Sequence, residues 1–308
     1  MTARTTRGAL PSAVRTTPGT TGLHLSRGGV SIILDLTHER MPSVAYWGAD
    51  LGPLSPDDVD LACSAATVAP NQNALDVPPR LGLLPQTADG WLGEPGIVGG
   101  RIDGSAFAPR LGLTHSEVST EADGSGHKTV LTMQLNDAEL ALGATLTLEL
   151  LNSGLIRTSG TLTNHGQSPY RLESYTLSLP VPAEATEILD FAGRWTRERE
   201  PQRLPVRVGQ HLRVNRRGRT GADSAYLMHV GTPGFSFGSG EVWAVHTAFS
   251  GGHRHVVERT SAGETIVGGG ESLLPGEVTL NTGDTYESPA VYAAVSYTHL
   301  RAHETEAD

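Results

Sequence analysis

Residues 129–135 read Thr-Val-Leu-Thr-Met-Gln-Leu, and residues 140–150 read Leu-Ala-Leu-Gly-Ala-Thr-Leu-Thr-Leu-Glu-Leu. Apolar and polar side chains alternate in both runs with a period near two, and the run from Leu155 to Asn164 continues the pattern. This period is typical of strands that bury one face. Asn152-Ser-Gly and Asn164-His-Gly follow such runs and predict hairpin turns. The stretch therefore predicts neighbouring antiparallel strands.

Short apolar runs separated by turn residues occur in both directions along the chain from this stretch. Short apolar runs of strand length occur earlier, around Leu23, from Gly29 to Leu36 and from Val44 to Gly48, and they recur as far as Tyr292. The chain's 37 glycines and 19 prolines lie between these runs, as expected for many turns. No window shows a convincing helical stripe. We therefore predict an all-β protein of antiparallel sheets packed face to face.

Composition narrows the function classes. The formal net charge is −10 and Lys128 is the only lysine, which argues against a nucleic-acid partner. Arginines gather between Arg194 and Arg219, where an ion-pair network is the plain interpretation. Cys63 is the only cysteine, so no intrachain disulfide and no cysteine-rich metal site can form. No motif indicates a cofactor.

No segment of the sequence predicts membrane insertion. The arginines near the N-terminus lack a following apolar segment, and the run from Val30 to Leu36 is far too short to span a bilayer. A cytoplasmic protein is therefore expected.

Two segments differ from the rest of the chain. Residues 1–21 are small and polar and predict a disordered lead-in. Residues 49–112 are rich in Pro, Gly, Asp and Asn without clear periodicity, and a connection of that length predicts a functional excursion. Within it, Asp57, Asp58 and Asp60 are interpreted as solvated loop charges, and Trp91 lies between turn residues.

Two apparent active-site motifs are better explained structurally. Gly234-Phe-Ser-Phe-Gly matches the G-x-S-x-G string of serine hydrolases, but the nucleophile needs a helix after it, and another strand is predicted there. The motif is interpreted as a glycine-flanked hairpin. His253 and His255 would share one strand face, as metal ligands can, but no third ligand stands nearby at a recognisable spacing. A hydrogen-bonded surface pair is predicted instead.

The stretch Gly193-Arg-Trp-Thr-Arg-Glu-Arg-Glu is unusual for a strand interior, since arginine is seldom fully buried. The face of Trp195 could pack on the C–H surface of a sugar ring, while Arg and Glu side chains bind its hydroxyl groups. Alternatively, Trp195 could pack at a domain interface with the arginines in ion pairs. The residues alone leave both interpretations open.

This stretch resembles the glycoside hydrolase family 36 α-galactosidases, in which Gly-x-Trp-x-Arg-Glu-Arg precedes an Arg-Arg-Gly-x-Thr/Ser string by some twenty residues. The second string appears here as Arg216-Arg-Gly-Arg-Thr. Further points fall in order over about residues 22–296, and their order and spacing make the resemblance specific. They are Tyr46-Trp-Gly, Gly240-Glu-Val-Trp-Ala before Phe249-Ser-Gly, and Leu274-Pro-Gly-Glu before Gly283-Asp-Thr-Tyr-Glu-Ser-Pro.

The resemblance implies an antiparallel β-supersandwich of the galactose-mutarotase-like kind, which precedes a (β/α)₈ barrel in the family. It implies that Trp195 helps form the galactose site. In some tetrameric relatives an early Asp and Arg reach a neighbouring subunit's site. The stretch from Cys63 to Val77 lacks those residues at the aligned positions, which leaves an oligomer open. Asp76 and Trp91 are predicted as local substitutes that bind substrate.

The resemblance also implies hydrolysis of terminal α-galactosyl groups with retention. That chemistry needs two carboxyl groups about 5–5.5 Å apart. In the family both belong to the barrel, which has no counterpart in the chain, so no catalytic residue is predicted here. The chain alone is expected to be inactive.

The last twelve residues are treated apart from the fold. The run Tyr297-Thr-His-Leu-Arg-Ala-His-Glu-Thr resembles translated adapter DNA, so residues 297–308 are expected to be a non-native tail. The expected domain is then residues 22–296 of a truncated α-galactosidase.

Two other interpretations stay open because a fold does not define a function. One is a complete sugar-binding β-sandwich module, which tight galactose binding would favour. The other is an aldose-1-epimerase-like enzyme, which mutarotation of galactose would favour, with His165 and Glu173 as the nearest acid–base pair.

Overall fold

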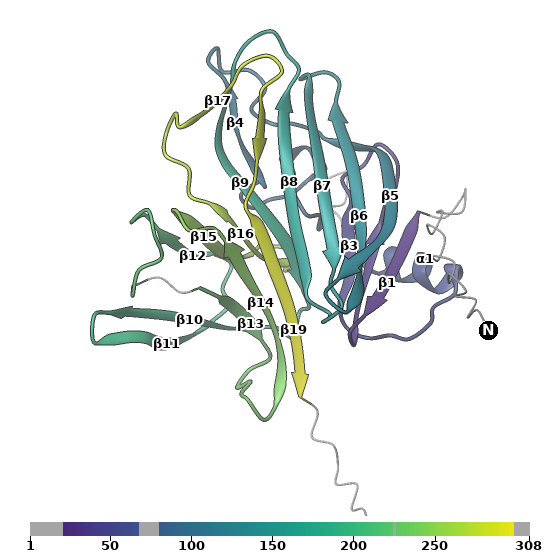
Figure 1. Ribbon diagram of the computed structural model, residues 1–308, viewed down its shortest axis with the longest axis vertical. Coiled ribbons are helices and arrows are strands. Elements are labelled where there is room, and N and C mark those ends of the chain that lie inside the picture. The colour runs from purple at the N-terminus through teal and green to yellow at the C-terminus, as the bar shows by residue number, and fades with distance from the viewer. Residues whose placement is uncertain (1–20, 68–79, 224–225, 299–308) are drawn as a thin grey trace, which may run out of the picture.

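The computed structural model describes residues 21–67, 80–223 and 226–298. Antiparallel strands dominate it, as the sequence predicts (Figure 1). The elements, in chain order, are β1 (Gly22–Arg27), β2 (Val30–Asp35), β3 (Ser43–Ala49), α1 (Pro56–Ala65), the 3₁₀ turn η1 (Thr87–Asp89), β4 (Ile97–Arg101), β5 (Gly112–Asp123), β6 (Gly126–Asp137), β7 (Leu142–Leu150), β8 (Ile156–Asn164), β9 (Tyr170–Val181), β10 (Glu187–Arg194), β11 (Arg197–Pro205), β12 (Gly209–Asn215), β13 (Met228–Gly231), β14 (Gly240–Ala248), β15 (His253–Arg259), β16 (Thr265–Glu271), β17 (Val278–Leu280), β18 (Thr285–Glu287) and β19 (Ala290–Thr298).

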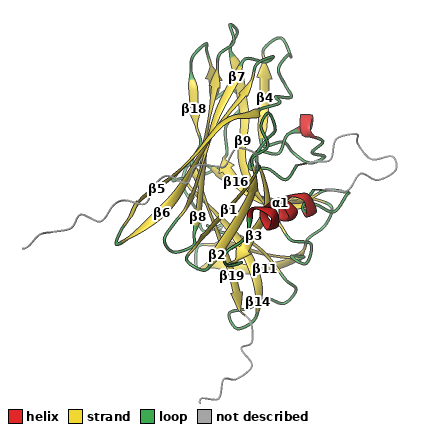
Figure 2. Ribbon diagram, turned by 90° about the vertical axis from the view of Figure 1, so that its right-hand side faces the viewer, coloured by secondary structure: helices red, strands yellow, loops and turns green. Residues whose placement is uncertain are grey.

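The strands form three sheets. The largest runs β11-β10-β13-β14-β19-β8-β7-β6-β5, with β18 also paired to β8. The second runs β12-β15-β16-β9-β17, with β4 also paired to β9, and β1-β2-β3 form a small third sheet. The two large sheets lie face to face as the layers of a sandwich, with the small sheet beside them (Figure 2).

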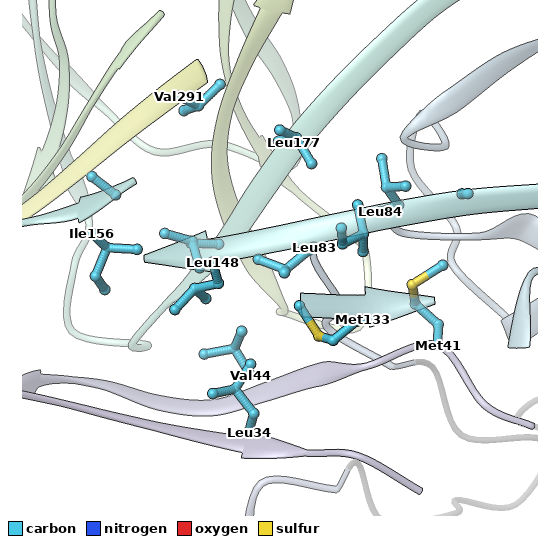
Figure 3. Packing of buried hydrophobic residues seen from close by; sticks show 14 of the residues in the cluster. Leu34, Met41, Val44, Leu83, Leu84, Met133, Leu148, Ile156, Leu177 and Val291 are labelled. Atoms are coloured by element: carbon cyan, nitrogen blue, oxygen red, sulfur yellow. The ribbon is translucent and has the colours of Figure 1, made fainter. Parts of the chain in front are cut away.

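The core lies between the layers and follows directly from the period-two pattern. Burial alternates residue by residue along β8, and Leu146 and Leu148 on β7 are fully buried. Leu148 belongs to the same hydrophobic cluster as Leu177 on β9, which comes from the opposite layer (Figure 3). The face-to-face packing predicted from the sequence is thus confirmed.

One of the two predicted hairpin turns is correct and the other is wrong. Asn152-Ser-Gly joins β7 to β8, which pair antiparallel. Asn164-His-Gly instead carries the chain from β8 in one layer to β9 in the other. Asn164 is fully buried there and its amide donates to the carbonyl oxygens of Ser168 at 3.0 Å and Leu280 at 2.9 Å. The bond to Leu280, 116 residues away, ties this connection to a distant segment and holds a crossover rather than a tight turn.

The excursion contains a helix that the sequence interpretation missed. Ser55 caps α1: its hydroxyl accepts from the backbone N–H of Asp58 at 3.2 Å, and the Asp58 carboxylate accepts from the backbone N–H of Ser55 at 3.1 Å. Pro56 occupies the first turn, where its missing N–H costs nothing. Asp57, Asp58 and Asp60 are therefore helix residues rather than loop charges. Only Val59 and Cys63 of α1 are buried, so the helical stripe is too narrow to recognise.

We expect Ser55→Ala to lower the free energy of unfolding by about 1 kcal/mol, because the backbone N–H of Asp58 loses its acceptor and the Asp58 carboxylate loses the bond from the Ser55 hydroxyl. Urea unfolding followed by circular dichroism measures it. Ser64→Ala, in the last turn of the same helix, is the control and should be close to neutral because alanine favours helix. Equal losses from both variants would show that the cap does not stabilise α1.

Some of the predictions concern residues at or beyond the ends of the described ranges. Residues 1–20, almost all of the predicted lead-in, lie outside the described residues, as does Asp76. Tyr297 and Thr298, assigned to the tail, form the end of β19, where Tyr297 pairs with Glu241 of β14. Among the described helices, none is long and apolar enough to cross a membrane.

Candidate functional site

Trp195 stands at the tip of a hairpin at one end of the ten-stranded sheet. β10 and β11 pair antiparallel, and the two residues between them, Trp195 and Thr196, form the turn. Trp195 is 83% exposed, so its side chain does not pack in the core of the sandwich. All nine residues of β11 are exposed, which leaves the hairpin projecting from the molecule, at the lower left of Figure 1.

A bulge next to the turn sets the direction of the tip. The register shifts between Ala192 and Arg194, and Arg199 on the facing strand has a left-handed backbone with φ of 57°. Gly193 fits only because it lacks a side chain. A Cβ there would lie 2.5 Å from the carbonyl oxygen of Arg197 and 2.7 Å from that of Ala222. The first glycine of the Gly-x-Trp string thus allows the 216–223 loop to lie against the hairpin.

The tip and this loop enclose an open groove of about 820 Å³, which we call the Trp195 groove. Its apolar lining includes Phe191, Trp195 and Tyr226, and the Arg199 guanidinium lies 5.8 Å from the centre of the Tyr226 ring. Its polar lining includes Glu198, Arg199, Arg217, Arg219 and Thr220. Both arginine-containing strings of the sequence therefore meet at one surface, although some twenty residues separate them. An aromatic face rimmed by hydrogen-bond donors suits a neutral polyol.

The carboxylates of the groove are already engaged. Glu198 accepts from the backbone N–H of Thr196 at 3.0 Å, and Asp223 pairs with Arg217 at 3.2 Å. Both side chains belong to exposed residues, so neither lies in the apolar surroundings typical of a general acid.

Two buried residues that support the groove were not recognised in the sequence. Asn215 is 2% exposed and closes the loop that follows β12, donating to the carbonyl oxygen of Arg219 at 2.8 Å while its own oxygen accepts from the N–H of Arg217 at 3.2 Å. Asp190 on β10 is fully buried and accepts from His211 at 3.0 Å and from Arg213 at 2.8 Å. The side-chain partners of Asp190 lie on β12 in the other layer, so no local motif marks it, whereas Asn215 binds residues two and four positions further along its own loop.

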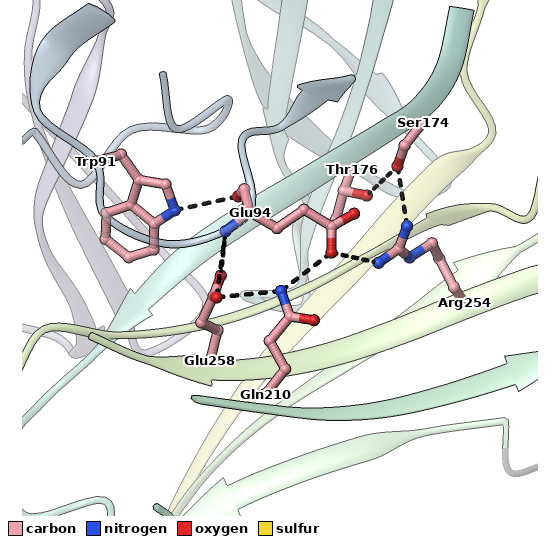
Figure 4. A network of polar contacts seen from close by, with 7 residues as sticks. All are labelled: Trp91, Glu94, Ser174, Thr176, Gln210, Arg254 and Glu258. Atoms are coloured by element: carbon pink, nitrogen blue, oxygen red, sulfur yellow. Dashed lines mark hydrogen bonds and ion pairs between the residues drawn. The ribbon is translucent and has the colours of Figure 1, made fainter. Parts of the chain in front are cut away.

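Trp91, predicted to bind substrate, is buried at 2% exposure. Its indole N–H donates to the carbonyl oxygen of Glu94 at 3.1 Å, and the N–H of Glu94 donates to Glu258 at 3.0 Å (Figure 4). Arg254 and Gln210 also bind the Glu94 carboxylate, at 2.9 and 3.0 Å. This network holds the excursion against the six-stranded sheet. Burial gives Trp91 a packing position and no open ring face for a ligand.

The G-x-S-x-G string and the histidine pair both lie outside the Trp195 groove. Ser236 lies in the turn between β13 and β14, which confirms the hairpin interpretation of the G-x-S-x-G string. His253 and His255 do share a strand, with ring centres 5.3 Å apart. Both are buried, so the prediction of a surface pair was wrong: the ring of His255 accepts from the N–H of Thr247 at 3.0 Å, and burial lowers its pKa to about 3. His165 and Glu173 are exposed.

Fold and site together define an antiparallel β-sandwich domain that presents an aromatic and arginine-rich groove at one sheet edge. The profile of the glycosyl hydrolase family 36 N-terminal domain matches residues 40–281. The chain is 32% identical over 257 residues to an α-galactosidase of Escherichia coli, covering 82% of this chain and 34% of that protein. It is 31% identical over 147 residues to a probable α-galactosidase of Emericella nidulans, covering 46% of this chain and 19% of that protein.

Solved structures show the same fold. The α-galactosidase of Lactobacillus brevis matches with a TM-score of 0.77 at 18% identity, over 92% of this chain and 40% of that one. A family 36 α-galactosidase of Geobacillus stearothermophilus matches with a TM-score of 0.75 at 20% identity, over 94% and 42%. The chain belongs to glycosyl hydrolase family 36, as its N-terminal domain. It spans about a third of the length of the Escherichia coli relative.

Proposed function

We propose that this domain supplies one wall of the galactose site of an α-galactosidase, with Trp195 as its sugar-contacting residue. The supporting observation is the position of Trp195, 83% exposed at a hairpin tip above a groove of about 820 Å³. The face of an indole can pack on the C–H surface of galactose while arginines donate to its hydroxyl groups. The membership of the family and its α-galactosidase relatives support this substrate class.

In this proposal the bond-breaking step belongs to another domain. Retaining hydrolysis needs a nucleophilic carboxylate and a second carboxyl group about 5–5.5 Å away that acts as acid and then as base. Glu198 and Asp223 beside the groove are held by Thr196 and Arg217 instead. A (β/α)₈ barrel, as the family resemblance implies, would bring both catalytic groups. A cytoplasmic location and a homo-oligomeric parent protein remain part of the proposal.

Trp195→Ala is expected to abolish contact between the chain and methyl α-D-galactoside. Saturation-transfer NMR suits this test because one wall of a site binds its sugar weakly. The stability of the variant should change by less than about 0.5 kcal/mol, because the side chain is exposed. Phe237→Ala is the matched control: Phe237 is a fully exposed aromatic residue in another turn, and its removal should leave the sugar signal intact.

The same sample also tests whether the chain alone catalyses a reaction. The chain alone should not cleave a nitrophenyl α-galactoside, and it should not speed the mutarotation of galactose. A sugar signal that survives Trp195→Ala would refute the assigned contact. Cleavage of the nitrophenyl α-galactoside by the isolated chain would refute the proposal that the bond-breaking step belongs to another domain. Faster mutarotation of galactose would favour an epimerase.

A further inference from the structure

The hairpin that carries Trp195 leaves the sheet before its tip. β10 pairs with β13 only through Glu187, Ile188 and Leu189. From Asp190 onward, β10 pairs within the described structure only with β11, whose own residues are all exposed. The outer half of the hairpin therefore projects without a flanking strand, and hairpins of two strands alone are marginally stable.

Asp190 occupies the first position beyond the last ladder pair. Its side chain is fully buried, and it points to β12 in the other layer of the sandwich. The carboxylate accepts from the ring of His211 at 3.0 Å and from two N–H groups of the Arg213 guanidinium, one of them at 2.8 Å. The second carboxylate oxygen accepts from the backbone N–H of Phe191 at 2.7 Å. Both guanidinium N–H groups meet the same carboxylate oxygen, and hydrogen bonds between charged partners are roughly twice as strong as those between neutral groups.

Arg213 also reaches the second strand of the hairpin. Gln202 on β11 lies directly opposite Asp190 in the register, and its side-chain oxygen accepts from Arg213 at 3.1 Å. One guanidinium thus ties both strands to the opposite layer at the point where the hairpin leaves the sheet. Phe191, the next residue along β10, lines the Trp195 groove.

We propose that Asp190 and Arg213 are positioning residues that hold the outer half of the hairpin so that Trp195 faces the groove. Neither touches substrate; both act through the hairpin that carries Trp195. The inference rests on the proposed function for its purpose, but its structural content can be measured without any sugar. Without the bonds made by Asp190 and Arg213, which we call the clamp, the outer half of the hairpin keeps its two-stranded ladder and the approach of Gly193 to the 216–223 loop. It also keeps two ring contacts, of Phe191 with His229 and of Arg199 with Tyr226.

The test uses Arg213→Lys in the full chain. Lysine keeps a cation beside Asp190, but its single nitrogen lacks the planar fork through which two nitrogens of Arg213 meet the carboxylate while one of them also reaches Gln202. The measured quantity is the order parameter of the backbone amides of residues 194–197, from ¹⁵N relaxation. We expect values of about 0.85 in the wild type and below about 0.6 in the variant.

A matched variant separates positioning from stability. Arg157→Lys alters another arginine that pairs with a buried carboxylate, Glu149, on β7 and β8. It should lower the thermal midpoint and leave the tip rigid. Gln202→Ala removes only the link to β11 and should loosen the tip even if Arg213→Lys fails to fold. Unchanged tip order in folded Arg213→Lys, or in Gln202→Ala should the first variant not fold, would overturn the inference.

A sugar measurement distinguishes this inference from the proposed function. Loss of the methyl α-D-galactoside signal in Arg213→Lys, together with a mobile tip, supports both. If the wild type gives no sugar signal, the proposed function fails, while the order parameters still decide whether the clamp holds the tip.

Discussion

Gly193→Ala is expected to displace the Trp195 turn and to lower the free energy of unfolding by about 1–3 kcal/mol, the usual cost of forcing atoms into a filled space. The new Cβ would lie 2.5 Å from the carbonyl oxygen of Arg197 and 2.7 Å from that of Ala222. Both contacts are with backbone, which cannot rotate away as a side chain can. Either the bulge in the hairpin opens or the 216–223 loop retreats, and each changes the groove.

The measurement combines urea unfolding with saturation transfer to methyl α-D-galactoside. Gly238→Ala is the control, because a Cβ at Gly238 meets nothing within 4 Å and its backbone has no positive φ. We expect this control to be neutral or slightly stabilising, since alanine restricts the unfolded chain. A Gly193→Ala protein with wild-type stability and sugar signal would show that the close approach is not needed.

The sheets were predictable where one face of a strand is buried. In β6, β7 and β8 the side-chain period of two is imposed by burial on one face, so the sequence itself displays the geometry. The helix α1 escaped prediction because it buries only Val59 and Cys63, although Ser55 and Asp58 form a capping box that could have revealed it. Asn164 escaped for a different reason: its crossover depends on Leu280, more than a hundred residues away.

The candidate site was predictable only in part. Trp195 was singled out because a tryptophan between arginines does not fit a strand interior, and its exposure agrees with that argument. Trp91 lies between turn residues, yet it is buried, because Glu258 and Arg254 bind the neighbouring Glu94 from more than a hundred residues away and no local pattern encodes that. Asp190 carries no local sequence signal, because its side-chain partners His211 and Arg213 lie on another strand in the other layer.

Asp190→Ala is expected to have the largest effect, a loss of about 3–5 kcal/mol of unfolding free energy at pH 7. The variant leaves the guanidinium of Arg213 in a partly buried site without its carboxylate partner. Burial alone would raise the pKa of Asp190, but the hydrogen bonds from His211 and Arg213 outweigh it and hold that pKa below its ordinary value. Asp223→Ala breaks the exposed pair with Arg217 and is the control, with an expected change within about 0.5 kcal/mol.

The pH dependence of this loss follows from the direction of the pKa shift. A carboxyl group whose pKa is lower in the folded than in the unfolded protein stabilises the fold above its unfolded value, near 3.9, and this stabilisation disappears as the pH falls through the folded value. The difference in unfolding free energy between wild type and Asp190→Ala should therefore be largest near pH 7 and should shrink as the pH is lowered below about 4. Urea titrations over that range measure it. A difference that stays constant into acid would mean that the packing of the lost carboxyl group, rather than the charge on Asp190, accounts for the effect.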